Sequence, residues 1–367
     1  MPAGFDKKIF DILSIDIILT VMLYNAIASV SLGRSSAGHS LITKIQQAAS
    51  VGFSGVEIFF ECLELYAREI EGRKTAASRK TLLEAAERVH EVCGKLRITV
   101  VCLMPFMNFE GLVDEYERKE KLDLLQFWFE LCQALGTDLI QMPTNFRSHG
   151  TTSDLERVVT DLRTAAELGL QQSPPIRFAY EAVSWGKHFD TWDQTWAVAK
   201  QVNLPNFGLC LDVFHIAGRV WADPSASSGL TENCEENLKR SLERLVQDVD
   251  PKKIFYVQIG DAEQLDKPIV PGHPLFEEGI KPRMSWSRNS RLYAFETDLG
   301  GYLPLERVCR AIFVQLGWEG WVSMEMFNKS LYQTSPEMVG KLATRAANSW
   351  SNFLVFLEKA SEKSQSA

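Results

Sequence analysis

The chain has 367 residues, of which 46% are hydrophobic, 10% aromatic and 23% charged, and its formal net charge is −8. These fractions are typical of a folded globular protein and exclude a disordered chain. An acidic chain without a dense block of lysine and arginine lacks the electrostatic footprint of a nucleic-acid binder. We therefore expect no nucleic-acid partner.

The first 24 residues are interpreted as an atypical N-terminal extension. Residues 9–24 are strongly apolar, but Asp11 and Asp16 interrupt them. The segment is also shorter than the ~20 residues that span a bilayer. Residues 7–8 and 26–28 imitate the flanks of a signal peptide, yet cleavage there would cut into the first expected strand. We expect no membrane association.

Short apolar runs alternate with longer amphipathic stretches along the rest of the chain. Eight runs are rich in β-branched and aromatic residues and have the length of strands. They span residues 25–32, 52–60, 97–106, 137–143, 176–183, 206–214, 253–260 and 320–327. Helical spacing of apolar residues is found at 41–51, 78–96, 119–136, 154–170, 189–202, 234–249, 303–317 and 338–359. Eight strand–helix units predict an α/β protein with the (β/α)8 TIM-barrel fold.

The barrel is expected to form a single domain over residues 25–359. No Pro/Gly/Ser-rich linker divides this range, and residues 360–367 are interpreted as a flexible tail. The longest stretch without an expected element, 261–305, follows the seventh strand. Long loops at the C-terminal face of a barrel build active sites, so this stretch is a candidate part of one.

The seven cysteines indicate a reducing compartment. Cys102 and Cys210 lie inside apolar runs, and no Cys-x-x-Cys pair occurs. Neither a zinc knuckle nor a disulfide framework is therefore expected. We interpret the cysteines as small buried hydrophobic residues of a cytoplasmic protein.

Polar residues lie at the ends of four successive strands. Glu181, Asp212, Gln258 and Glu325 each stand among apolar neighbours at the C-terminal end of strands five to eight. Any one of them could face solvent, but three carboxylates crowded at one end of a barrel repel one another unless a cation neutralises them. An all-oxygen ligand set suits Mg²⁺ or Mn²⁺ better than zinc, and Co²⁺ is an alternative. The pattern predicts a divalent-metal site.

Several segments carry a resemblance to a known family. They are SVSLGR (29–34), GVEIFFE (55–61), PFMNFEGL (105–112), YEAVSWG (180–186), GLCLDVFHIAGR (208–219), YVQIGDAE (256–263), WSRNSRLYAFE (286–296) and GGYLPL (300–305). From about residue 25 to 357 the sequence resembles the fungal 3-dehydroshikimate dehydratases of quinate catabolism. These belong to the xylose isomerase-like, sugar-phosphate isomerase/epimerase barrel superfamily.

The resemblance implies a role for each matching residue. The family's metal ligands fall on Glu181, Asp212, Gln258 and Glu325. Its histidine falls on His215, which becomes the candidate general base, with Glu181 as a second catalytic residue. Its substrate-contacting serine and arginine fall on Ser287 and Arg291, and Arg291 would pair with the substrate carboxylate.

Two further candidates follow from position alone. His39, after the first strand, and Glu57, near the end of the second, lie at the end of the barrel where they could touch substrate.

The implied reaction is the dehydration of 3-dehydroshikimate to protocatechuate by a metal-dependent hydro-lyase. A dication would stabilise the enolate formed when the proton beside the ketone leaves, and the β-hydroxyl would then depart as water. The partner is thus a small-molecule substrate. The aromatic-rich residues 124–132 fit either the barrel exterior or a subunit contact, so a homo-oligomer stays open.

Other readings use the same fold. A sugar isomerase or epimerase is the main alternative, although Gln258 and an arginine-bearing loop count against it. An endonuclease IV-like nuclease needs a histidine-rich zinc cluster, and the chain has six histidines in all. A metabolite-binding sensor would not require four converging metal ligands. Within the dehydratase reading, His215 could instead orient Asp212.

Overall fold

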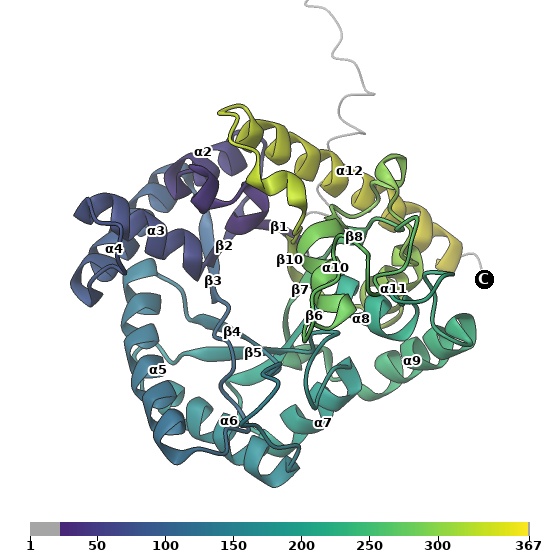
Figure 1. Ribbon diagram of the computed structural model, residues 1–367, viewed down its shortest axis with the longest axis horizontal. Helices are drawn as coiled ribbons and strands as arrows, with labels where there is room; N and C mark the ends of the chain where they lie inside the picture. Colours follow the sequence, from purple (N-terminus) through teal and green to yellow (C-terminus); the bar gives the residue numbers. More distant parts are fainter. Residues whose placement is uncertain (1–22, 366–367) are drawn as a thin grey trace, which may run out of the picture.

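Eight parallel strands close into a barrel in the computed structural model, which describes residues 23–365 (Figure 1). The strands are β1 (Leu23–Ala28), β2 (Gly55–Phe59), β3 (Thr99–Met104), β4 (Leu139–Pro143), β5 (Arg177–Glu181), β6 (Phe207–Asp212), β7 (Ile254–Ile259) and β10 (Gly320–Met324). Each pairs with its neighbour in sequence, and β10 pairs with β1 to close the ring. The predicted (β/α)8 barrel is therefore confirmed. Apart from residues 23–24, the expected N-terminal extension lies outside the described residues.

Helices surround the strands, as Figure 1 shows. They are α2 (Leu41–Ser50), α3 (Phe60–Glu71), α4 (Arg79–Leu96), α5 (Glu115–Leu135), α6 (Leu155–Leu170), α7 (Trp192–Val202), α8 (Val213–Val220), α9 (Cys234–Asp248), α10 (Pro282–Ser290), α11 (Leu305–Cys309) and α12 (Met338–Gln365). Apolar side chains of the strands and of the inner helix faces form one large buried cluster between the two layers. None of the described helices is long and apolar enough to cross a membrane.

Some elements differ from the sequence prediction. Helices α3 and α8 follow their strands directly, and α8 starts because the Asp212 side chain accepts a hydrogen bond from the backbone N–H of Phe214 at 2.7 Å. The helix expected at 303–317 is α11 followed by a π-helical turn, η5 (Arg310–Gln315). Helix α12 continues to Gln365, past the expected end at 359 and into the range interpreted as a tail.

The long stretch after β7 is folded against the end of the barrel. Two short strands, β8 (Asp261–Ala262) and β9 (Arg291–Leu292), pair antiparallel, and α10 lies between them in sequence. Asn328, which follows β10, donates to the Arg291 carbonyl at 3.0 Å, and the Arg291 N–H donates to the Phe327 carbonyl at 2.9 Å. These bonds fix β9 beside the loop that follows β10.

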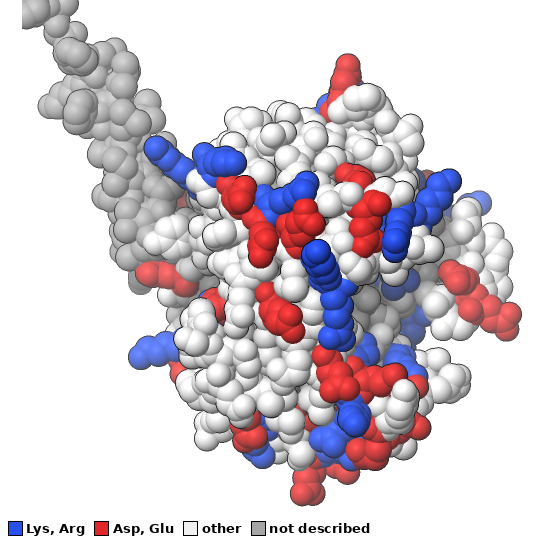
Figure 2. Space-filling model, turned by 90° about the vertical axis from the view of Figure 1, so that its left-hand side faces the viewer, with Lys and Arg blue, Asp and Glu red and all other residues white. Residues whose placement is uncertain are grey.

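Charged side chains are mixed over the face of the molecule drawn in Figure 2. Lysine and arginine alternate there with aspartate and glutamate, and neither sign forms a continuous patch on that face.

Candidate active site

The four predicted metal ligands lie at the C-terminal ends of neighbouring barrel strands. Glu181 is the last residue of β5, Asp212 the last of β6, Gln258 is in β7, and Glu325 directly follows β10. Asp212 pairs in register with Gln258, so their side chains start next to each other. All four residues are buried. Parallel strands end at the same face of the barrel, and this face is where the sequence placed them.

Contacts between these side chains show that they converge. Arg291 Nη1 donates to Asp212 Oδ2 at 2.8 Å and to Glu325 Oε2 at 2.7 Å. Gln258 Nε2 donates to Glu325 Oε1 at 3.1 Å. Ligand atoms of Glu181, Asp212 and His215 lie within 4.8 Å of one another, close enough to hold a metal ion. We call Glu181, Asp212 and Glu325 the carboxyl cluster.

The carboxyl cluster carries more negative charge than its surroundings compensate. Burial raises the pKa of Glu181 well above its usual value, and the charges of Glu325 and Asp212 raise it further. Burial also raises the pKa of Glu325, to about 8, and that of Asp212, although the Arg291 charge lowers both. Glu181 Oε1 is buried without a hydrogen-bond partner. A divalent cation would supply both the missing charge and the missing partner, so the residues fit such an ion.

Gln258 presents its nitrogen, rather than its oxygen, to this cluster. Its Nε2 donates to both oxygens of Glu57, at 3.2 and 3.0 Å, as well as to Glu325. The amide oxygen instead accepts from Cys210 Sγ at 3.3 Å. Coordination through the amide oxygen requires Gln258 to turn its side chain.

His215 lies against the cluster in a form that can accept a proton. Its Nε2 lies 3.5 Å from Asp212 Oδ2 and 2.8 Å from Arg291 Nη2. Its Nδ1 lies 3.2 Å from Ser184 Oγ, and an Nδ1–H that donates to this hydroxyl leaves Nε2 as the nitrogen that accepts from Arg291. Burial lowers the pKa of His215 well below its usual value, and the Arg291 charge lowers it further. The imidazole is therefore neutral near pH 7, as a general base must be.

Ser287 and Arg291 meet as the sequence predicts, but Arg291 is already occupied. Arg291 Nε donates to Ser287 Oγ at 2.9 Å, and the guanidinium lies 3.8 Å from the ring centre of Phe214. Its other nitrogens face two carboxyl groups and His215. In this arrangement Arg291 neutralises the carboxyl cluster and has no free edge for a substrate carboxylate.

A cavity of about 500 Å³ opens above the cluster at the end of the barrel. We call it the mouth cavity. Glu181, His215, Arg291 and Glu325 reach its inner end. Its outer lining includes Arg34, Phe59, Glu61, Glu64, Met104, Phe146, Trp185, Arg288, Phe327 and Tyr332.

Two of the predicted substrate contacts lie elsewhere. His39 is buried and its Nε2 lies 2.6 Å from the Gln333 carbonyl. Glu57 is fully buried beneath Gln258, in a part of the barrel that also holds Cys102 and Tyr256. Neither lines the mouth cavity, because the backbone directs each side chain into the protein interior. We therefore do not assign substrate contact to them.

Sequence reasoning missed two residues that contact the site. Gln141, in β4, donates from Nε2 to Glu181 Oε2 at 2.5 Å, and Ser184 holds His215. A polar residue within the apolar run 137–143 is the same signal that identified Gln258, so Gln141 could have been found. Ser184 follows the strand at 176–183, and no spacing in the sequence places its hydroxyl 3.2 Å from His215 Nδ1.

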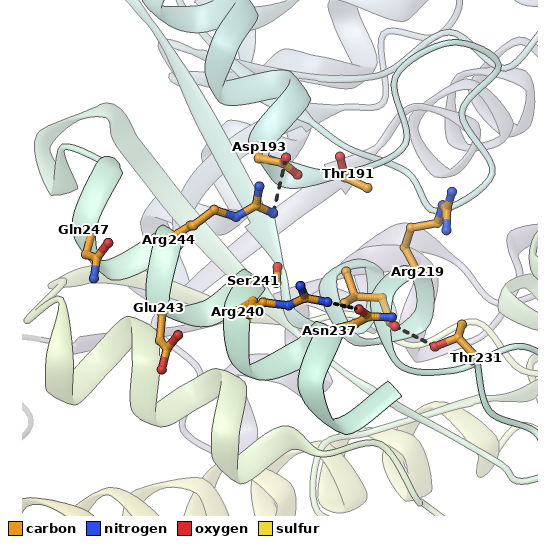
Figure 3. Close-up of a pocket in the computed structure, with 11 residues that line it drawn as sticks. Thr191, Asp193, Arg219, Thr231, Asn237, Arg240, Ser241, Glu243, Arg244 and Gln247 are labelled. Atoms are coloured by element: carbon orange, nitrogen blue, oxygen red, sulfur yellow. Dashed lines mark hydrogen bonds and ion pairs between the residues drawn. The ribbon is translucent and has the colours of Figure 1, made fainter. Parts of the chain in front are cut away.

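A second hollow lies on the outside of the barrel between α7 and α9, and Figure 3 shows the side chains that line it. Its volume is about 600 Å³. Its polar groups are engaged with one another: Arg244 lies 3.5 Å from Asp193, and Arg240 donates to Asn237 at 2.8 Å. It lies on the helical layer and contains none of the carboxyl cluster, so we place the active site at the mouth cavity.

Comparisons with known proteins show the family of the chain. The family model of the xylose isomerase-like TIM barrel matches residues 45–348. The chain is 44% identical over 333 residues to the 3-dehydroshikimate dehydratase of Neurospora crassa, which covers 90% of this chain and 93% of that protein. It is 29% identical to the 3-dehydroshikimate dehydratase of Pseudomonas putida over 83% of this chain, and it spans 38% of that protein's length.

A solved structure shows the same fold. A xylose isomerase-like TIM barrel/4-hydroxyphenylpyruvate dioxygenase fusion protein matches with a TM-score of 0.66 and 27% identity. The match covers 89% of this chain and 42% of that one.

Proposed function

The chain belongs to the family of xylose isomerase-like TIM barrels, and on that premise we propose that it is a hydro-lyase that dehydrates 3-dehydroshikimate to protocatechuate. The relative from Neurospora crassa supports this substrate, because the two proteins match over nearly their whole lengths. The structural observation that carries the proposal is the carboxyl cluster beside a neutral His215 at the inner end of the mouth cavity. That arrangement suits removal of a proton next to a ketone.

Glu181, Asp212, Gln258 and Glu325 would hold a divalent cation, for which we propose Mg²⁺ or Mn²⁺, with Co²⁺ as an alternative. The support is the unpartnered Glu181 oxygen and the raised pKa values of the cluster. When bound, such an ion polarises the ketone oxygen and stabilises the negative charge that develops on it. Gln258 joins the set if its amide oxygen turns toward Glu325.

The chain's own residues supply the remaining steps. His215 Nε2 faces the cluster and takes the proton from the carbon beside the ketone. The hydroxyl on the next carbon leaves with the proton that His215 has taken, which forms water and frees the base. Glu181 lines the cavity next to His215, and we keep it as the second catalytic residue, beside that carbon. Ser287 lines this inner end and its hydroxyl contacts a substrate oxygen, while Arg291 stays paired with the carboxyl cluster. Trp185, whose ring packs edge-on against His215 at 4.9 Å, excludes water from one side.

The test is an assay of purified protein after a chelator has removed its metal. We expect 3-dehydroshikimate to give the absorbance of a catechol acid only after Mg²⁺ or Mn²⁺ is added back. Ketose sugars, the substrates of the alternative epimerase, should give no product. Glu325→Gln should lose turnover by a factor of about 10³ or more, since it removes a charged ligand. No catechol with metal present would contradict the proposal.

The remaining properties stay predictions. These are a cytoplasmic location and the lack of a nucleic-acid or membrane partner, while the oligomeric state stays open.

A further inference from the structure

Three arginines line the mouth cavity, and they differ in what they contact. Arg291 is 1% exposed and pairs with Asp212 and Glu325. Arg34 pairs with Glu61 at 3.1 Å. Its guanidinium also lies 5.8 Å from the ring centre of Phe327 and 5.4 Å from that of Tyr332. Both of these side chains are fixed by their partners.

Arg288, on α10, is the third. It is exposed to solvent and lines the cavity, yet its guanidinium has no hydrogen bond or ion pair with any described residue. Partial burial and the nearby positive charge of Arg34 lower the pKa of Arg288, whereas the negative charge of Glu277 raises it. Two like charges that face one hollow repel each other, and an anion placed near them would relieve that repulsion.

The acidic residues of the cavity's outer lining do not compensate Arg288. Glu61 is paired with Arg34, and Glu64 is paired with Arg68 at 2.5 Å. Arg283, which precedes Arg288 on α10, donates to the Gly218 and Ala222 carbonyls at 2.8 Å and serves the fold. Arg288 is therefore the lining arginine to which the described residues offer no direct hydrogen bond or ion pair, and of the acidic residues only the more distant Glu277 acts on its charge.

The chemistry of the proposed substrate places an anion at this point. In 3-dehydroshikimate the carbon that loses its proton lies directly across the six-membered ring from the carbon that bears the carboxylate. If the proton-losing carbon faces His215 and the ketone faces the carboxyl cluster, the carboxylate must point outward, away from both. Arg291 touches the cluster itself, so it lies at the ketone end of the substrate.

We propose that Arg288, with Arg34 beside it, binds the substrate carboxylate at the outer end of the mouth cavity. The assignment rests on the proposed dehydratase function and goes beyond it. In this assignment Arg291 acts at the inner end of the site. Arg288 is the residue that selects a substrate whose ring bears a carboxylate. A guanidinium that forms a charge-assisted, two-pronged contact with a carboxylate is worth a factor of about 10–100 in affinity.

The experiment compares Arg288→Gln with the wild type in two ways. In steady-state kinetics we expect KM for 3-dehydroshikimate to rise about 10–100-fold while kcat changes less than about threefold, because the contact is far from the reacting carbons. In calorimetry without turnover, the wild type should bind protocatechuate more tightly than catechol, which lacks the carboxylate. Arg288→Gln should lose that preference.

Controls separate the local effect from general electrostatics. Lys329→Gln removes a positive charge from an exposed residue close to Tyr332 that does not line the cavity, and it should leave both readouts unchanged. Arg288→Lys keeps the positive charge but lacks the two-pronged guanidinium, and it should retain part of the preference for protocatechuate over catechol.

The outcomes are distinct. If Arg288→Gln leaves KM and the preference unchanged while Arg291→Gln abolishes the preference, the carboxylate lies at Arg291 and the assignment is overturned. A wild-type protein that turns over 3-dehydroshikimate but binds catechol and protocatechuate equally also overturns it and leaves the function standing. A wild-type protein that prefers protocatechuate, loses this preference in Arg288→Gln and shows no turnover with metal supports the carboxylate site and contradicts the dehydratase function.

Discussion

Arg291 shows how a single side chain stabilises an otherwise unfavourable cluster. Within the described part of the chain, it is the only arginine or lysine that pairs with Asp212 or Glu325, and it is itself fully buried. Burial raises the pKa of Glu181, and the neighbouring carboxyl groups raise it further, because one positive charge does not balance three carboxyl groups. Breaking such a buried pair on one side is costly, because the other charge loses its partner.

Glu57 stabilises Gln258 through hydrogen bonds, as Arg291 stabilises the carboxyl cluster, and a substitution of Glu57 should therefore affect metal binding. The Glu57 carboxyl oxygens accept from Gln258 Nε2, so they hold the nitrogen end of the amide beneath the site. A side chain held at its nitrogen can turn its oxygen toward a cation, whereas Glu57→Gln offers both a donor and an acceptor and fixes neither end. We expect Glu57→Gln to weaken Mn²⁺ binding about 10–100-fold in calorimetry.

The kinetics of the same variant separate this role from substrate binding. At saturating metal, KM for the substrate should stay within about twofold of the wild type, because Glu57 does not line the mouth cavity. Glu130→Gln, on the exposed side of α5, is the control and should change neither value. Unchanged Mn²⁺ affinity together with a raised KM would show that Glu57 touches substrate after all.

Prediction from sequence succeeded for residues whose position is set by the strands alone. Glu181, Asp212, Gln258 and Glu325 come together because parallel strands of a closed barrel end at one face. His39 was not predictable in this way, because it follows a loop with a positive φ at Gly33, and the direction of its side chain depends on that local turn. The partners of Arg291 depend on how the segment after β7 folds back, and no spacing in the sequence encodes that.

Helices and strands, too, were predicted where their own sequence determines them and missed where distant contacts do. Strands and long amphipathic helices were predicted because apolar periodicity marks them over many residues. Helix α3 was missed because its fully buried residues are few, and α10 because it is polar and lies in a segment held by β8 and β9. Both are stabilised by contacts with distant parts of the chain, which local sequence does not reveal.

The connections after β3 and β4 are joined by a buried carboxyl group whose ionisation should affect stability. Glu110 Oε1 accepts from the Asn145 N–H at 2.6 Å and from the Tyr180 hydroxyl at 3.0 Å, and Glu110 Oε2 has no partner. Burial raises the pKa of Glu110 to about 7, against its hydrogen bonds, which lower it. Near neutral pH the Glu110 carboxyl group therefore begins to ionise, although it is buried between the two connections.

The sign of the pH dependence follows from proton binding. Between the unfolded pKa of 4.5 and the folded pKa of about 7, the folded chain holds the Glu110 proton and the unfolded chain has lost it. The free energy of unfolding therefore falls as pH rises through this range, by about 3 kcal/mol in total. In Glu110→Gln that contribution is absent, so the variant's stability relative to wild type should rise by about 3 kcal/mol between pH 4 and pH 8.

Urea unfolding at the two pH values measures this difference. Glu130→Gln serves as the control, since the exposed carboxyl group on α5 faces water in both states. If the gap between Glu110→Gln and wild type is the same at both pH values, Glu110 titrates normally and does not couple the two connections in this way.

The last helix, α12, supports the active site through its contacts with the segment that follows β9. Arg345, on α12, donates to both carboxyl oxygens of Glu296, at 2.9 and 2.8 Å, and Ser349 Oγ donates to the Ala294 carbonyl at 2.7 Å. Residues 294–296 follow β9, which carries Arg291. The C-terminal helix thus holds the segment that neutralises the carboxyl cluster.

A substitution of Phe353 tests whether α12 and the barrel unfold together as one cooperative unit. Phe353 is fully buried, and its ring lies 5.0 Å from that of Phe313, 5.4 Å from that of Trp350 and 6.3 Å from that of Phe295.

Removing the ring in Phe353→Ala leaves a cavity between α12, η5 and the segment after β9, at a cost of about 3–5 kcal/mol in the free energy of unfolding. We expect the urea midpoints followed by far-UV circular dichroism and by tryptophan fluorescence to fall together, because the barrel and its helices share one buried cluster. Val355→Ala, at a position 48% exposed, should shift neither midpoint by more than the error. A fluorescence midpoint that falls while the circular dichroism midpoint stays in place would mean that α12 and the site loops unfold apart from the barrel.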